Sequence, residues 1–141
     1  MTIVRIVWVA PSDRRQGKRE PIREEILRKE NAMAFKTAFI IMAPGGDPTK
    51  DRALIKTPKL ELTSVVVGQM NFDQAVAVCK EMAEEEGVRS FTLCPGFTHG
   101  AIARIQDAVG ENVAISVARG DAPGGKIVGG ILKKEGWLEG R

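Results

Sequence analysis

Residues 71–118 read NFDQAVAVCKEMAEEEGVRSFTLCPGFTHGAIARIQDAVGENVAISVA, and this stretch decides the fold. Its apolar residues recur first at helical spacing, then in a short continuous run, and then in both patterns again. The helical patterns span 72–86 and 99–109, and the strand patterns span 90–94 and 113–118. Gly87 and Gly110 follow the helical patterns and predict where the helices end. This order is typical of parallel strands joined by right-handed helical crossovers.

Both predicted helices carry signals for their first residue and for the side that faces the core. Asn71 is a good N-cap with Gln74 in the capping-box position, and Thr98 caps the second helix. The residues that share an inward side are Phe72, Ala75, Val76, Cys79, Met82 and Ala83 in the first helix and Ile102, Ile105 and Val109 in the second. Cys79 is therefore predicted to be a core thiol rather than a reactive one.

Two further strands are predicted upstream of this stretch. FKTAFIIM (35–42) is a nearly continuous apolar run, as expected for a parallel strand buried on both faces, and LELTSVVV (60–67) is predicted as the second strand. A Gly/Pro-rich loop separates them, and residues 51–56 are interpreted as a short helical turn. The resulting order is β–loop–β–α–β–α–β. We predict an α/β fold with a small, mostly parallel sheet of about four strands and helices packed on it.

The two ends of the chain differ from this regular region. Residues 1–32 hold eight Lys/Arg and five Asp/Glu, and they account for the whole net charge of +3. Ile3–Val9 could form a short strand, and Ile22–Glu30 has helical composition. Met33 has the character of a natural start, so we expect a charged extension over 1–32, not necessarily native, and one domain over 33–141. The Gly-rich tail could add an edge strand or cover one end of the sheet.

Composition narrows the class of protein. Acidic residues interleave with the basic ones in the N-terminal segment, which favours a solvated appendage over a nucleic-acid-binding arm. No apolar run approaches the roughly 20 residues that span a bilayer. The first apolar run contains Arg5 and lacks a small-residue cleavage site, which argues against a signal peptide. Two cysteines do not make a disulfide framework, so we expect a cytoplasmic protein with reduced thiols.

Candidate functional residues cluster after the predicted strands. Ligands of open parallel sheets bind beyond the carboxyl ends of the strands, and a helix N-terminus there favours an anion. The candidate catalytic residues are Cys94 and His99, and the candidate ligand-binding residues are Gly45, Gly46, Asp47, Gly96, Thr98 and Arg119. The glycines would let main-chain N–H groups approach a ligand.

The chemistry at this edge stays open on sequence grounds. A thiol beside an imidazole would form a nucleophile–base pair, but the spacing of Cys94 and His99 lets them face each other or diverge. Cys94 could equally be a small buried hydrophobe, and His99 a solvent-facing residue of the helix start. One histidine and two cysteines cannot complete a four-ligand zinc site, and Mg²⁺ held by Asp47 or Asp121 has no supporting motif. Neither a P-loop nor a GxGxxG motif is present, so the identity of any cofactor stays unknown on sequence grounds.

Three stretches resemble a family of proteins. FKTAFIIMAPGGDP (35–48), KTPKLELTSVVV (56–67) and LCPGFTHGAIARIQDAVG (93–110) are similar to an uncharacterised family of small bacterial proteins with a domain of unknown function. The resemblance covers roughly residues 35–119. It implies a Gly-Gly-Phe turn after the cysteine, and here Pro95 replaces the first of those glycines and removes an N–H donor.

Two functions follow as expectations. The first is binding of a small anionic molecule at the carboxyl ends of the strands, with catalysis left open. The second is a non-catalytic, homo-oligomeric assembly or interaction domain. It is suggested because two clear helices leave apolar sheet surface uncovered, and the tail with Trp137 and Leu138 could cover that of a neighbour.

Overall fold

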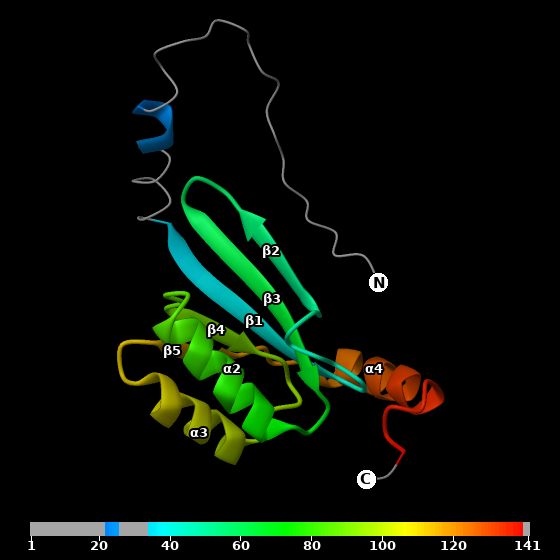
Figure 1. Ribbon diagram of the computed structural model, residues 1–141. Helices are drawn as coiled ribbons and strands as arrows, with labels where there is room; N and C mark the ends of the chain where they lie inside the picture. Colours follow the sequence, from blue (N-terminus) through cyan, green and yellow to red (C-terminus); the bar gives the residue numbers. More distant parts are fainter. Residues whose placement is uncertain (1–21, 26–33, 140–141) are drawn as a thin grey trace, which may run out of the picture.

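The computed structural model describes residues 22–25 and 34–139 (Figure 1). Residues 22–25 are helical, in agreement with the helical composition of that segment. The strand expected at Ile3–Val9 and the rest of the expected helix over 22–30 lie outside the described residues.

One sheet of five strands organises the chain, in the order β2-β3-β1-β4-β5. The strands are β1 (Phe35–Ala43), β2 (Arg52–Lys56), β3 (Leu60–Gly68), β4 (Ser90–Leu93) and β5 (Ala114–Val117). All neighbours pair in parallel except β2, which runs antiparallel to β3. The predicted α/β class and the mostly parallel sheet are therefore confirmed, with one strand more than expected.

The additional strand is β2, and the helical turn expected over residues 51–56 is wrong. Leu54 pairs with Thr63 and Lys56 with Glu61 across the antiparallel ladder. The main-chain N–H of Val66 also donates to the carbonyl of Asp51 at 2.9 Å. A strand of five residues has too little local pattern to identify itself, and the long neighbour β3 supplies the partner that stabilises it.

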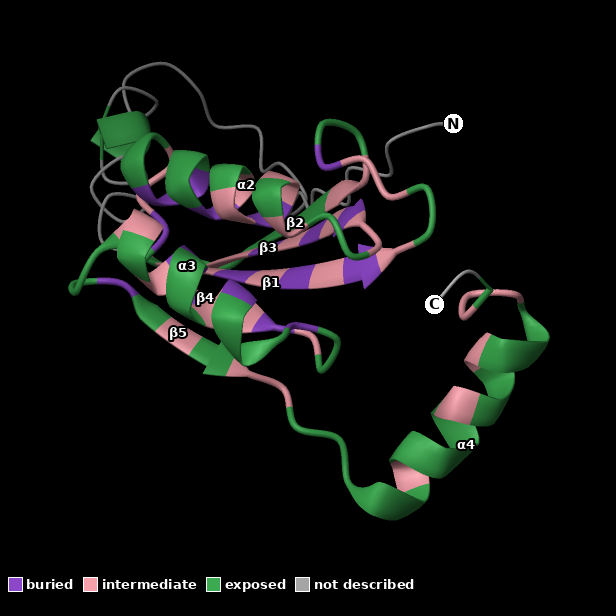
Figure 2. Cartoon of the chain, turned by 90° about the horizontal axis from the view of Figure 1, so that it is seen from below, coloured by how far each residue is buried: buried purple, intermediate pink, exposed green. Residues whose placement is uncertain are grey.

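Two helices, α2 (Phe72–Glu84) and α3 (His99–Val109), lie side by side on one face of the sheet (Figures 1 and 2). Their predicted caps are present: Asn71 Oδ1 accepts from Gln74 N at 3.1 Å, and Thr98 Oγ1 accepts from Ala101 N at 3.2 Å. The Gln74 side chain departs from a capping box, because its Oε1 accepts from the N–H of Gly68 at 2.7 Å. It thereby fastens α2 to the end of β3.

Among the described residues, the hydrophobic core lies between the sheet and these two helices. Ile40, Val65, Phe91, Leu93 and Ile105 are completely buried there. Burial alternates along β1 and β3, as the purple and pink residues of β1 show in Figure 2. The expectation that both faces of β1 are buried is therefore wrong. The other face of the two strands is half-buried and carries no helix among the described residues.

We call this uncovered side the open face. The strand registers assign to it Phe35, Thr37, Phe39, Ile41 and Ala43 of β1, Leu60, Leu62, Ser64 and Val66 of β3, Ala53 and Ile55 of β2, Ser90 and Thr92 of β4, and Ala114 and Ser116 of β5. None of these residues is charged. The charged residues of the strands, Lys36, Arg52, Lys56 and Glu61, all point to the side that carries the helices.

The Gly-rich tail forms a further helix, α4 (Ala122–Lys134), and not an edge strand. Asp121 caps it by accepting from Gly124 N at 2.9 Å. It lies beyond the carboxyl edge of the sheet and has no buried residue (Figure 2). Gln69 Nε2 donates to the carbonyl of Trp137 at 2.8 Å and ties the segment after α4 to the loop after β3. Among the described residues, no helix has the length and apolarity of a bilayer-spanning segment.

Burial of Cys79 predicts a pH dependence of stability. Burial raises the pKa of this thiol from 9.0 to about 12, because the core disfavours the thiolate. The unfolded chain then binds fewer protons than the folded one between these values, so the stability contributed by Cys79 is present below pH 9 and is lost as the pH rises through this window. Between pH 8 and 10, the free energy of unfolding of Cys79→Ala, measured with urea, should fall by about 1 kcal/mol less than that of the wild type. Met82→Leu, the control, should show the same pH dependence of stability as the wild type. If Cys79→Ala lost as much stability as the wild type over this pH range, Cys79 would not be the titrating group.

Candidate functional site

The predicted site residues lie on three neighbouring loops at the carboxyl edge of the sheet. Cys94 N donates to the carbonyl of Ile40 in β1 at 3.0 Å, and Ala118 N donates to that of Leu93 in β4 at 2.8 Å. The chain at Cys94 is therefore flanked by the end of β1 on one side and by Ala118–Arg119 on the other. The parallel ladder alone brings these loops together.

A tight turn carries the chain from β4 into α3. Phe97 N donates to the carbonyl of Cys94 at 3.3 Å, which closes the turn Cys94–Phe97. The Phe97 side chain is buried and packs on Phe72 of α2, with ring centroids 6.1 Å apart. Pro95 and Gly96 at the tip are exposed. The turn is thus anchored in the core while its tip faces solvent.

Cys94 and His99 occupy different environments. The Cys94 side chain is half-buried and packs against the core cluster, and its Sγ lies on the Gly96 side, 3.7 Å from where a β-carbon on Gly96 would be. His99 is the first residue of α3 and is exposed. In the described part of the chain no hydrogen bond joins the two side chains. The nucleophile–base pair therefore stays a prediction.

The N-terminus of α3 and Arg119 are the groups at this edge that could hold an anion. Thr98 uses its hydroxyl for Ala101 N and its carbonyl for Ile102 N at 3.0 Å. The main-chain N–H groups of His99 and Gly100 come before the first internal bonds of the helix. Arg119 is exposed beside the turn, one residue beyond the last ladder bond of β5.

The Asp47 side chain makes its contacts within its own loop. Its Oδ1 accepts from the N–H and the hydroxyl of Thr49 at 3.0 and 2.7 Å, and Lys50 Nζ lies 3.4 Å from its Oδ2. The hydrogen bonds from Thr49 hold the pKa of this carboxyl below its ordinary value. Its main-chain N–H donates to Asp51 Oδ2 at 2.9 Å. These bonds fix the loop between β1 and β2, which gives Asp47 a structural role without any ligand.

The candidate glycines also have packing reasons. Gly45 has φ +70°, a conformation that favours glycine in its turn. A β-carbon on Gly46 would overlap the main-chain carbonyl of Val67, whose carbon would lie 2.8 Å away. One on Gly96 would lie 2.8 Å from the terminal methyl of Met42. Close approach to protein, rather than to a ligand, thus explains Gly46.

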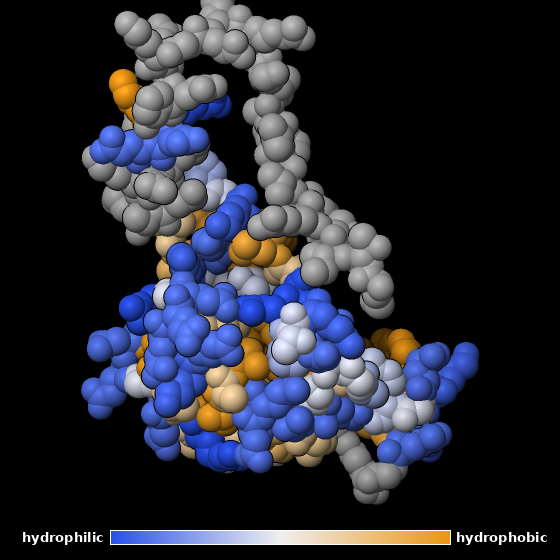
Figure 3. All heavy atoms as spheres, in the orientation of Figure 1, coloured by the Kyte–Doolittle hydropathy of each residue, from blue (hydrophilic) through white to orange (hydrophobic). Residues whose placement is uncertain are grey.

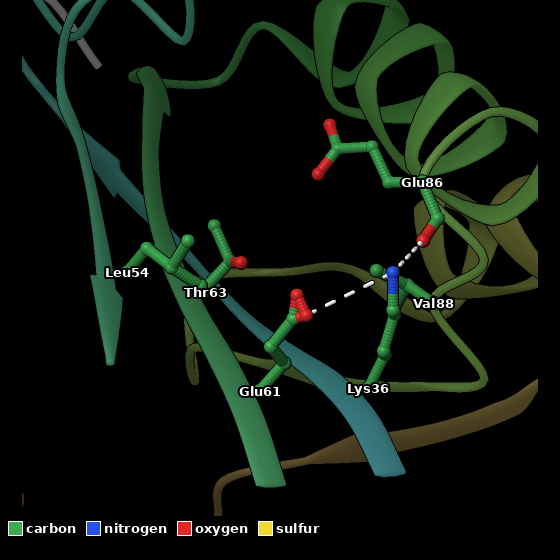
Figure 4. A pocket seen from close by; sticks show the side chains of 6 residues that line it. All are labelled: Lys36, Leu54, Glu61, Thr63, Glu86 and Val88. Carbon is green, nitrogen blue, oxygen red and sulfur yellow. Dashed lines mark hydrogen bonds and ion pairs between the residues drawn. The ribbon is translucent and has the colours of Figure 1, made fainter. Parts of the chain in front are cut away.

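A second polar region, which the sequence did not indicate, lies between α2 and the start of β3 (Figure 4). It is a hollow of about 50 Å³ lined by Lys36, Leu54, Glu61, Thr63, Glu86 and Val88. Thr63 is only 9% exposed and its side chain points into the hollow. The hollow is not evident from the sequence, because β2 supplies one of its walls and the sequence pattern of β2 predicts a helical turn.

Ion pairs surround this hollow. Lys36 Nζ donates to the carbonyl of Glu86 at 2.9 Å and lies 3.8 Å from Glu61 Oε2. Lys56 Nζ lies 3.0 Å from Glu61 Oε1, and Arg52 Nη2 lies 2.6 Å from Glu86 Oε1. These pairs neutralise both carboxylates and link β2 to β3 and to the turn after α2. Within residues 22–25 and 34–139, no three His, Cys, Asp or Glu side chains gather as metal ligands.

Substitution of Gly46 tests its packing role. Gly46→Ala forces a β-carbon against main-chain atoms that cannot move independently, so we expect a loss of about 1–3 kcal/mol in the free energy of unfolding. Gly100→Ala in α3 meets nothing within 4 Å and should leave the free energy unchanged or raise it by up to about 1 kcal/mol. Urea unfolding of both variants makes the comparison. Wild-type stability of Gly46→Ala would show that the loop is free to shift.

Comparison with known proteins adds the family. No curated protein matches the chain. A family model described as a family of unknown function, DUF6506, matches residues 35–129, which is the region from β1 into α4. The match extends ten residues beyond the resemblance seen in the sequence and takes in the first part of α4. With most of its length covered by this model, the chain belongs to the family of unknown function DUF6506.

Proposed function

We propose that the protein binds a small anionic ligand at the carboxyl edge of its sheet, between the first turn of α3 and Arg119. The supporting observation is the parallel pairing of β4 with β5, since Leu93 pairs with Val117 and both chains leave the sheet at the same level. The start of α3 and Arg119 therefore belong to adjacent loops.

Electrostatics favours an anion there. The aligned peptide dipoles of α3 put partial positive charge at His99 and Gly100, which stabilises an anion by about 0.3–1 kcal/mol at an exposed site. The Arg119 guanidinium presents paired donors that match a carboxylate or a phosphate. No ion pair of Arg119 is recorded with any described residue, so its charge is available to a ligand.

In this proposal the other predicted residues shape the site and do not hold the anion. Cys94 and Gly96 form the wall and tip of the turn beside the ligand, and the His99 ring borders it. Gly45, Gly46 and Asp47 shape the neighbouring loop through their own contacts. No hydrogen bond joins the Cys94 and His99 side chains in the part of the chain that the structure describes, so the proposal is for binding alone.

A thermal-shift titration with inorganic phosphate and with small mono- and dicarboxylates tests this site. A ligand at 100 times its dissociation constant adds about 2.7 kcal/mol to the free energy of unfolding, which gives a measurable rise in Tm. Arg119→Ala should weaken binding roughly 10-fold or more, since charge-assisted hydrogen bonds contribute about 1.5–3 kcal/mol.

Arg89→Ala is the matched control, because Arg89 is an exposed arginine at the opposite end of β4. It should bind as the wild type does. If Arg119→Ala and Arg89→Ala weakened ligand binding equally, binding would depend only on the total charge of the protein. If no ligand raised the Tm of the wild type, the proposal would be overturned.

A further inference from the structure

The open face has the chemistry of a buried surface. A sheet with one solvated face ordinarily places polar and charged residues on that face. Here the strands place their four charged residues on the side that carries the helices and none on the other. Phe39, Ile41, Leu62 and Val66 instead form an apolar strip over β1 and β3, the two longest strands. Exposure of this face to water is therefore unfavourable.

A second apolar surface is uncovered on α4. Ile127, Val128 and Ile131 share one side of this helix and are 67, 52 and 54% exposed. Figure 3 shows hydrophobic atoms reaching the surface of α4 beside hydrophilic ones. The surrounding glycines at 124, 125, 129 and 130 leave the helix backbone accessible to close packing. The chain thus leaves an apolar helix side exposed and an apolar sheet strip only half-buried.

The two surfaces match in size. A helix is about 10 Å across with its side chains, which is the width of two strands spaced about 4.8 Å apart. Thirteen residues give α4 a length of about 20 Å, against about 30 Å for the nine-residue strands β1 and β3. One copy of α4 therefore fits along the strip.

Both ends of α4 are tied beyond the carboxyl edge of the sheet in its own chain. Residues 118–121 connect its start to the end of β5. Just after its end, the carbonyl of Trp137 accepts from Gln69 Nε2 of the loop after β3 at 2.8 Å. These two attachments hold α4 off the strip of its own chain. A helix running along the strip must come from elsewhere.

We propose that two copies of the chain form a dimer in which the α4 helix of each copy lies on the apolar strip of the other. Twofold symmetry pairs both surfaces reciprocally and leaves neither exposed. A helix about 10 Å across and 20 Å long turns about 300 Å² of its curved side toward the sheet and covers about 200 Å² of flat sheet. Two such contacts bury on the order of 1,000 Å², which is about the least area expected of a biological interface.

Two variants of the full-length chain test this arrangement by sedimentation velocity and light scattering. Ser64→Lys adds a charge to the strip between Leu62 and Val66 without removing an apolar group, and Ile131→Glu adds one to the exposed side of α4. Each should raise the dimer dissociation constant roughly 100-fold, because the new charge would be buried without a partner. Ala77→Lys on the exposed side of α2 and Lys133→Glu on the far side of α4 should dimerise as the wild type does.

Mixing the two variants separates this dimer from other assemblies. Ser64→Lys retains a sound α4 and Ile131→Glu retains a sound strip, so the mixture should form heterodimers at concentrations where each variant alone is monomeric. Undiminished dimerisation of Ile131→Glu would mean that two sheet faces pack directly on each other and would overturn the proposal. A wild type that is still monomeric at about 1 mM would also overturn it.

A lipid surface is the remaining partner for an amphipathic helix with lysines. Vesicles of phosphatidylcholine with phosphatidylserine should not bind the wild-type protein more than they bind Ile131→Glu. Ile131-dependent binding to these vesicles by a monomeric wild type would assign α4 to membranes instead.

Discussion

The handedness of the crossovers between parallel strands determines most of this structure. The connection from β3 through α2 to β4 and that from β4 through α3 to β5 advance in the same direction across the sheet. Right-handed crossovers in one direction put both helices on one face. The connection from β1 to β3 advances the other way and would place a helix on the opposite face, but it contains the in-plane strand β2 instead. The open face is the direct result.

The carboxyl edge combines a rigid support with exposed functional groups. Phe97 anchors the turn after β4 in the core, and Gly46 and Asp47 are held by contacts within their own loop and with β3. These residues keep the loops in place, whereas His99 and Arg119 stand at the solvent side of the same edge. The division between residues that shape an edge and residues that can meet a ligand is therefore visible only in three dimensions.

The sequence predicted the elements that are stabilised locally and missed those that depend on distant partners. Helices α2 and α3, with the caps Asn71 and Thr98, were predicted closely because capping and apolar spacing are local signals. Strand β2 depends on its pairing with β3, and α4 contains four glycines, each unfavourable by about 1 kcal/mol in a helix. Of the site, the sequence predicted the shared edge but not whether Cys94 and His99 meet, because the direction of a side chain after a turn is not encoded in spacing.

The ion pairs at the hollow also oppose edge-to-edge pairing of this sheet with the sheets of other copies, which would lead to fibrils. Among the described residues no strand pairs with the outer edge of β2, and an unpaired edge is the usual template for aggregation. Arg52 and Lys56 stand on this strand, tied to Glu86 and Glu61, so an approaching strand meets two fixed cations beside the ladder it would extend. At the other margin β5 is only four residues long and offers a minimal template. Lateral growth is thus discouraged at both margins, while the flat side of the sheet stays accessible.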